Sequence, residues 1–258
     1  MLALLAQMAS VPGSPAANAE RAAAALAAHP DVEIAVFPEL FLGGYELARL
    51  ADSARPADCA ELRTIAEAAE AVSTAVAVGF AERNTDGTFS NSVACIDRDG
   101  SLAAVYRKTQ LFGAEREAFR AGDALVVVRL AGLAVALLVC FDVEFPEPAR
   151  QLARAGAELL VTVSANMEPF GPDHELATRA RALENRLPHV YVNGVGTIGG
   201  LQLVGLSRSV GPSGDVLAQA GAEEELLVAL VARPGTDDER VDYLRHLPDP
   251  LDIIGGNV

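Results

Sequence analysis

The feature that most constrains the fold is a set of short segments that are apolar at nearly every position. Residues 2–8 (LALLAQM) and 133–139 (LAVALLV) are two examples. A strand with one solvated face alternates apolar and polar residues, whereas a continuously apolar strand needs cover on both faces. Segments with helical periodicity, such as 60–73, lie between these runs. The pattern therefore favours an α/β fold in which helices cover the sheets.

The order of the segments adds detail to this prediction. We expect helices at 14–29, 60–73, 147–155 and 173–187, and strands at 2–8, 32–37, 74–82, 88–97, 102–107, 125–130, 133–139, 159–164 and 190–195. Turns with Asp-Gly at 84–87 and 97–100 predict hairpins, while the alternation of helices and strands predicts parallel pairs. A layered sandwich with helices outside two mixed sheets satisfies both. No repeat or low-complexity linker interrupts 1–258, which predicts a single domain.

Composition excludes several classes of function. The 258 residues carry a formal net charge of −15, so the basic face that a nucleic-acid binder needs is not expected. No uncharged apolar stretch of about 18 residues occurs, and the first residues lack the basic region of a signal peptide. These observations predict a cytoplasmic protein that does not cross a membrane.

Motifs for cofactors and for other hydrolases are not found. The three cysteines and four histidines show no ligand spacing, so we expect neither a metal nor a disulfide framework. The sequence has no phosphate-binding GxxxxGK loop, no GxGxxG after a strand and no GxSxG. Nucleotide chemistry and a serine nucleophile are therefore disfavoured.

Cys140 directly follows the apolar segment 133–139. Polarity returns at once with Asp142 and Glu144, and a helix is expected to begin near Pro146. This strand–turn–helix order can present a nucleophile at the end of a sheet and leave main-chain N–H groups free for an oxyanion. The alternative is an inert buried thiol, which is common for free cysteine.

Two charged residues also follow predicted strands. Glu39 lies between apolar residues after strand 32–37, where desolvation would raise its pKa as a general base requires. Lys108 follows strand 102–107, and its ammonium could favour a thiolate and bind an oxyanion. A capping or paired glutamate and a solvated surface lysine are the alternatives. Because open α/β sheets place their chemistry at the carboxyl ends of strands, the three residues together indicate thiol-based acyl transfer.

Three ordered motifs resemble the nitrilase superfamily of carbon–nitrogen hydrolases. They lie at 37–40 (FPEL), 106–112 (YRKTQLF) and 140–147 (CFDVEFPE), and the similarity extends from the first strand to residues 242–245. The resemblance implies a four-layer α-β-β-α sandwich, usually a homodimer or higher homo-oligomer, with a Glu-Lys-Cys triad and no cofactor.

The resemblance also assigns roles to residues. It implies that Glu39 is the general base, that Lys108 stabilises the oxyanion and that Cys140 is the nucleophile. A second glutamate that holds the lysine corresponds to Glu115, with Glu117 as the weaker candidate. The residues that it implies for substrate binding are Tyr45, Phe141 and Asn166.

Substrate identity stays open at this stage. Segments 164–170 and 179–185 are similar to aliphatic amidases of the 5-aminopentanamidase and stereoselective type, which predicts hydrolysis of a small aliphatic amide through a cysteine thioester. An N-carbamoyl compound, an ω-amide and a nitrile are alternatives, and a catalytically silent binding module is another. Segment 179–185 could instead hold salt bridges near a dimer interface. The acidic residues Asp142, Glu144, Glu168 and Asp173 could recognise a substrate amine, although a structural role, shared by Glu147, is the favoured interpretation.

Overall fold

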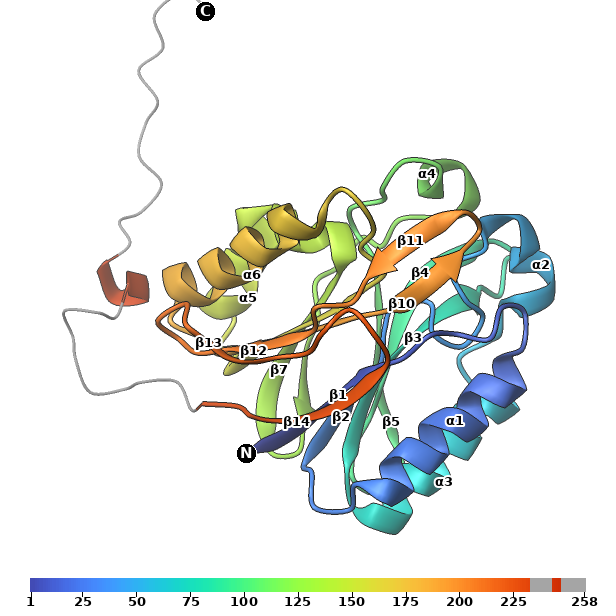
Figure 1. Cartoon of the computed structure of the whole chain (residues 1–258), viewed down its shortest axis with the longest axis horizontal. Coiled ribbons are helices and arrows are strands. Elements are labelled where there is room, and N and C mark those ends of the chain that lie inside the picture. The colour runs from blue at the N-terminus through green and yellow to red at the C-terminus, as the bar shows by residue number, and fades with distance from the viewer. Residues whose placement is uncertain (233–242, 247–258) are drawn as a thin grey trace, which may run out of the picture.

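Two six-stranded sheets face each other, and helices cover the outer face of each sheet (Figure 1). The computed structural model describes residues 1–232 and 243–246. The layers follow the order helix, sheet, sheet, helix, so the predicted four-layer α-β-β-α sandwich is confirmed. The family-like segment 242–245 begins at Asp242, which lies outside the described residues.

Both sheets mix parallel and antiparallel neighbours. The first has the spatial order β14 (Glu225–Leu230), β1 (Leu2–Gln7), β2 (Ile34–Val36), β3 (Ala75–Arg83), β4 (Phe89–Ile96) and β5 (Leu102–Arg107). The second has the order β13 (Val216–Gln219), β12 (Arg208–Val210), β9 (His189–Asn193), β8 (Leu159–Ser164), β7 (Leu133–Val139) and β6 (Val127–Leu130). A separate hairpin joins β10 (Val195–Ile198) to β11 (Leu201–Val204).

The helices form two pairs. One outer layer holds α1 (Pro15–Ala28) and α3 (Ala60–Val72), and the other holds α5 (Pro146–Arg154) and α6 (Gly171–Asn185). Shorter helical turns are η1 (Leu47–Arg49), α2 (Leu50–Ser53), α4 (Glu115–Ala118), η2 (Cys140–Glu144) and η4 (Tyr243–His246). No helix in the described part of the chain is long and apolar enough to cross a membrane.

Continuous apolar strands arise because each sheet is buried on both faces. Leu5, Val36 and Leu137 belong to the cluster between the sheets. Their strand neighbours Leu4 and Leu138 point the other way, toward the helix layers. The apolar runs therefore predicted this architecture correctly.

One predicted strand is two strands. The segment 190–195 divides at Gly194, where β9 ends and the β10–β11 hairpin begins. A Cβ atom at Gly194 would lie 2.9 Å from the side chain of Leu203, so a residue with a side chain would push the hairpin away. The Asn193 side chain donates to the main-chain oxygens of Asn166 and Gly205, which fixes the change of direction.

The topology brings several strand ends to one edge. Strands β1, β2 and β3 run parallel, and β5 shares their direction because it follows two antiparallel pairings. In the facing sheet, β7, β8 and β9 are also parallel. Glu39, Lys108 and Cys140 follow the carboxyl ends of β2, β5 and β7, as predicted.

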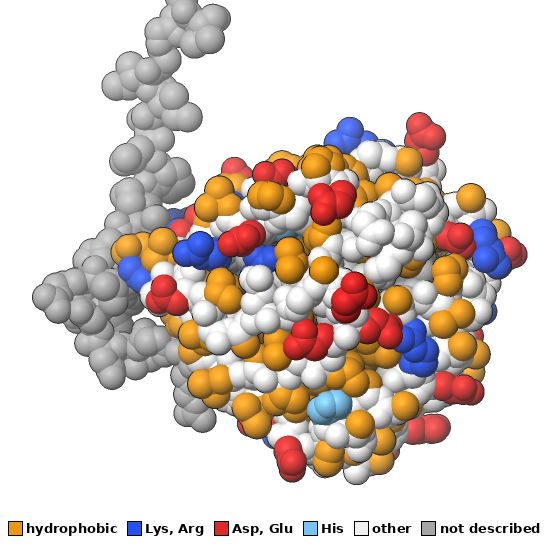
Figure 2. Space-filling view, in the orientation of Figure 1, with side chains coloured by type: hydrophobic (Ala, Val, Ile, Leu, Met, Phe, Trp, Pro, Cys, Tyr) orange, Lys and Arg blue, Asp and Glu red, His pale blue; other side chains and the backbone are white. Residues whose placement is uncertain are grey.

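The surface agrees with the acidic composition. On the face shown in Figure 2, Lys and Arg side chains stand singly among acidic, apolar and uncharged groups. Apolar side chains gather over β1 and β14 on this face, where Leu2, Val228 and Leu230 are exposed.

Candidate active site

The loop after β2 places the Glu39 carboxylate inside the protein. The side chain is wholly buried, and Oε2 of Glu39 accepts a hydrogen bond of 2.7 Å from the main-chain N–H of Ala165. Strand β3 passes directly beneath this loop at Gly79, where a Cβ atom would lie 2.3 Å from the Pro38 carbonyl oxygen. Only a residue without a side chain lets the loop approach so closely, and the approach holds Glu39 above the sheet.

Lys108 lies between two buried carboxylates. Its Nζ is 2.7 Å from Glu39 Oε1 and 2.9 Å from Glu115 Oε2, and all three side chains are at most 1% exposed. Asn91 Nδ2 donates to both carboxylates, at 2.7 Å to Glu39 and 3.2 Å to Glu115. We call Glu39, Asn91, Lys108 and Glu115 the buried ion cluster. Glu117 is exposed, which leaves Glu115 as the second carboxylate.

Cys140 opens a strained turn after β7. Its φ of 45° lies in the left-handed region, which is rare for a residue with a side chain and often marks a functional site. The turn η2 follows at once and α5 begins at Pro146, so the predicted strand–turn–helix order is confirmed.

A small pocket opens beside the Cys140 side chain. Its empty volume, part of which is open to solvent, is about 240 Å³, and its lining consists of Phe112, Cys140, Phe141, Glu144, Asn166, Met167, Phe170 and His174. The rings of Phe112 and Phe141 meet edge to face at 5.3 Å between centroids. The walls are therefore largely aromatic, with a few polar groups, as small-molecule sites usually are.

Asp142 cross-links the turn to the segment that carries Lys108. Its Oδ2 accepts from the main-chain N–H of Val139 at 2.9 Å and from the Tyr106 hydroxyl at 2.8 Å. Its Oδ1 accepts from the N–H of Gln110 at 2.8 Å and from the Thr109 hydroxyl at 3.1 Å. The favoured structural interpretation of Asp142 is confirmed, because both oxygens are fully used.

Burial controls the protonation of the site. Desolvation raises the pKa of the Cys140 thiol, the charge of Glu39 raises it further, and Lys108 lowers it only in part. The prediction that Lys108 would favour a thiolate is thus outweighed by burial. Desolvation also raises the pKa of Glu39, as predicted. Burial would lower the pKa of Lys108, but the charge of Glu39 reverses this and raises the pKa well above its ordinary value. Burial therefore favours the thiol form of Cys140, while the neighbouring carboxyl groups favour the ammonium form of Lys108.

The residues predicted for substrate contact divide into two groups. Phe141 and Asn166 line the pocket. Tyr45 instead donates to Glu115 Oε1 at 2.9 Å, so the structure places it against the buried ion cluster. Of the other acidic candidates, Glu168 and Asp173 are exposed outside the pocket, whereas Glu144 lines it.

The sequence did not identify the polar residues Asn91 and His174, nor the apolar lining residues Phe112, Met167 and Phe170. Asn91 is a buried polar residue in the middle of β4, and that position was an available signal. His174 lies on α6 and reaches the pocket only because the helix packs over η2, which no local pattern predicts. Its ring nitrogens contact Tyr191 Oη at 2.9 Å and Glu144 Oε1 at 3.2 Å.

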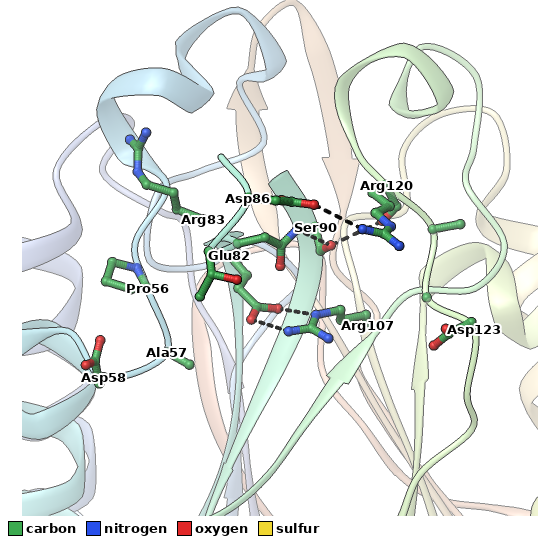
Figure 3. Close-up of a pocket in the computed structure, with 14 residues that line it drawn as sticks. Pro56, Ala57, Asp58, Glu82, Arg83, Asp86, Ser90, Arg107, Arg120 and Asp123 are labelled. Atoms are coloured by element: carbon green, nitrogen blue, oxygen red, sulfur yellow. Dashed lines mark hydrogen bonds and ion pairs between the residues drawn. The ribbon is translucent and has the colours of Figure 1, made fainter. Parts of the chain in front are cut away.

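A second hollow lies at the other side of β5. Figure 3 shows Arg107 paired with Glu82 there, through two contacts of 2.7 Å, and Arg120 paired with Asp86 at 3.1 Å. Arg107 therefore points away from the buried ion cluster that its neighbour Lys108 joins. Within the described residues, no group of three or more His, Cys, Asp or Glu side chains could hold a metal ion.

Comparison with known proteins agrees with this geometry. The carbon-nitrogen hydrolase family model matches residues 2–239. An (R)-stereoselective amidase from Pseudomonas sp. is 41% identical over 223 residues, which are 85% of this chain and 81% of the relative. A nitrilase from Pyrococcus abyssi is 31% identical over 83% of this chain and 82% of its own length.

Solved structures give the same result. An amidase of the nitrilase superfamily from Nesterenkonia sp. AN1 has a TM-score of 0.86 and 30% identity, over 96% of this chain and 94% of that one. A variant of the Nesterenkonia amidase carries the acetamide moiety of fluoroacetamide on its active-site cysteine, with a TM-score of 0.85, 30% identity and coverage of 95% and 92%. The resemblance inferred from three motifs is confirmed: this chain is an enzyme that belongs to the carbon–nitrogen hydrolase family.

Proposed function

We propose that the protein is an amidase that hydrolyses a small aliphatic amide to a carboxylic acid and ammonia through a thioester on Cys140. The observation that carries the proposal is the buried ion cluster beside a strained cysteine that lines a small pocket. A base, a cation and a thiol are the groups that thiol-based acyl transfer requires. The relatives named amidases support the choice of an amide.

In the first half of the reaction, Cys140 Sγ forms a bond to the amide carbonyl carbon while its proton passes to Glu39. The negative charge that develops on the carbonyl oxygen is stabilised by Lys108 and by the main-chain N–H of Phe141. Glu39 then gives its proton to the nitrogen, the carbon–nitrogen bond breaks and ammonia leaves. The raised pKa of Glu39 suits a group that must accept and return a proton near neutral pH.

In the second half, water attacks the thioester carbonyl carbon and gives a proton to Glu39. The tetrahedral intermediate collapses, the carbon–sulfur bond breaks, and the sulfur recovers the proton from Glu39. The acid leaves and the enzyme returns to its initial state. Glu115 and Asn91 hold Lys108 and Glu39 in place throughout, since both contact these side chains directly.

Ammonia release from butyramide tests the proposal. We expect the wild type to release ammonia and Cys140→Ala to release none above background. Cys59→Ser is the matched control, because the Cys59 sulfur accepts from the Leu62 N–H as an N-cap and serine serves well at that position. This control should keep wild-type activity. Amide hydrolysis by Cys140→Ala at the wild-type rate would contradict the mechanism.

Labelling separates an enzyme from a silent binding module. Fluoroacetamide should add one acetamide group per chain, on Cys140, and an amide substrate should slow the addition. A panel with an N-carbamoyl compound, an ω-amide and a nitrile tests the other reactions that the same three groups can serve. We expect the simple amide to give the highest kcat/KM.

The wider arrangement is part of the proposal. We infer that residues 1–258 act as one domain and that two copies form a homodimer in the cytoplasm. The exposed apolar side chains on α6 and β13, among them Leu176 and Leu217, support a protein contact there. Light scattering on the purified protein would give the mass of the assembly.

A further inference from the structure

Among the residues that line the pocket, one side chain is acidic. Glu144 lines the pocket together with Cys140, and its side chain is 32% exposed. The other polar lining groups are the thiol, the Asn166 amide and the His174 ring. Glu144 therefore largely determines which chemical group the pocket accepts at the end of the substrate away from the amide.

The Glu144 carboxylate is only partly used by the protein. Oε1 lies 3.2 Å from His174 Nε2, whereas within residues 1–232 and 243–246 no hydrogen bond engages Oε2. Asp142, two residues earlier on the same turn, accepts four hydrogen bonds with its two oxygens. Asp142 thus has a structural role, while Glu144 keeps acceptor capacity at the pocket.

Lys108 and Arg181, two cations near the pocket, are paired within the protein. Lys108 lies between Glu39 and Glu115, so the buried ion cluster carries no surplus positive charge. Arg181 donates to the main-chain oxygens of Val143 and Glu144, but its Nη1 pairs with Glu184 at 2.6 Å. No lysine or arginine in the described part of the chain lines the pocket, so a substrate carboxylate would meet Glu144 without a cation beside it.

His174 engages only one oxygen of the Glu144 carboxylate. Its Nδ1 contacts Tyr191 Oη at 2.9 Å, so the ring is held between Tyr191 and Glu144. Tyr191 Oη donates its one hydrogen to Ser164 Oγ at 3.1 Å and can only accept from His174, so the imidazole donates through Nδ1–H. The contact at Nε2 fixes the orientation of Glu144 through Oε1 and leaves Oε2 open to a ligand.

We propose that Glu144, held by His174, selects amides that carry an ammonium group and rejects amides that carry a carboxylate. The inference rests on the proposed amidase function and names its substrate class. It assigns to Glu144 a role in specificity that the favoured structural interpretation did not include. Amides of amino-substituted acids are the expected substrates, and monoamides of dicarboxylic acids are the excluded class.

Four amides with four carbons each test the proposal: butyramide, 2-aminobutyramide, 4-aminobutyramide and succinamate. In the wild type, we expect kcat/KM for at least one amino compound to exceed that for butyramide by about tenfold, the factor that corresponds to about 1.4 kcal/mol. Succinamate should fall below butyramide by a similar factor. In Glu144→Gln, which keeps an acceptor for His174, the kcat/KM of the amino compounds and of succinamate should both approach that of butyramide.

Ratios within one variant cancel differences in the folded or active fraction. Glu147→Gln is the matched control, because Glu147 is exposed on α5 and borders a different hollow. This control should leave both ratios at their wild-type values. Equal kcat/KM for amino and neutral amides in the wild type, or an unchanged preference in Glu144→Gln, would overturn the proposal while butyramide hydrolysis still supports the amidase function. If the wild type hydrolysed none of the four amides, the amidase function itself would be overturned instead.

Discussion

Replacing Lys108 by methionine tests whether this residue holds the buried ion cluster together, in addition to its proposed role at the oxyanion. The substitution keeps the length of the side chain and removes the charge that lies 2.7 Å from Glu39 and 2.9 Å from Glu115. Two wholly buried carboxylates then face each other and share only the Asn91 amide. Breaking a buried pair in this way costs about 3–5 kcal/mol of stability.

The loss of stability should depend on pH. Desolvation already raises the pKa of Glu39 above its ordinary 4.5, and Lys108 partly opposes the rise. Without Lys108, the folded-state pKa rises further, so the folded variant binds a proton that the unfolded chain releases above pH 4.5. Stability therefore falls as pH increases, by about 1.4 kcal/mol per pH unit for one proton, until the folded-state pKa is passed. The difference from the wild type should be small at pH 5 and large at pH 8.

Urea unfolding between pH 5 and pH 8 gives the stability, and ammonia release gives the activity. We expect kcat to fall by about 100- to 1000-fold, the range for loss of one oxyanion donor. Arg120→Met is the control, because Arg120 and its partner Asp86 are 66% and 49% exposed and the pair lies away from the buried ion cluster (Figure 3). That change should cost about 1 kcal/mol or less, with no pH trend and no loss of kcat. A Lys108→Met variant whose stability loss is under about 1 kcal/mol and flat with pH would refute the reasoning, because a buried carboxylate pair cannot lose its cation at so low a cost.

Three further predictions test other parts of the site. Asp142→Asn should lower stability by about 2 kcal/mol in urea unfolding, since an amide turns its N–H₂ toward two of the four donors; an unchanged midpoint would contradict the structural role. Iodoacetamide should react with Cys140 of the free enzyme at a rate that still rises at pH 9, because burial raises the pKa of the thiol, whereas a plateau below pH 7 would indicate a preformed thiolate. Tyr45→Phe removes the hydrogen bond to Glu115 and should lower kcat several-fold with little change in KM; a rise in KM alone would restore the predicted role in substrate contact.

The layers of this fold could be predicted because burial acts on each strand locally. A strand such as β7 is apolar on both faces, and that pattern is readable in the sequence without knowledge of its neighbours. Glu39, Lys108 and Cys140 could be predicted for a related reason, since a polar residue at the end of a buried strand has few places to lie. The division of 190–195 at Gly194 could not be predicted, because it depends on a contact with Leu203 in a different strand.

The contacts among the polar residues of the pocket could not be predicted from local sequence patterns. His174 and Glu144 meet because α6 packs across η2, and the periodicity of either segment is the same whether or not they touch. The same holds for Asn91, whose amide finds Glu39 and Glu115 only after β4 pairs between β3 and β5. Residues at the ends of strands can thus be predicted from the sequence, whereas contacts that depend on helix packing or strand pairing are known only from the structure.

One compositional signal for Lys108 was present and unused. The chain has 20 lysines and arginines, and Lys108 is the single lysine among them. A residue type that the rest of the chain avoids is poorly explained as a solvated surface charge, which was the alternative for Lys108. The structure supplies the physical reason: an ammonium is compact and directs its three N–H bonds tetrahedrally, so it can reach Glu39, Glu115 and a developing oxyanion at once. A planar guanidinium donates in one plane and needs more room, so arginine suits the pairs of Figure 3, where the Arg107 and Arg120 side chains are 49% and 66% exposed, and not the buried ion cluster.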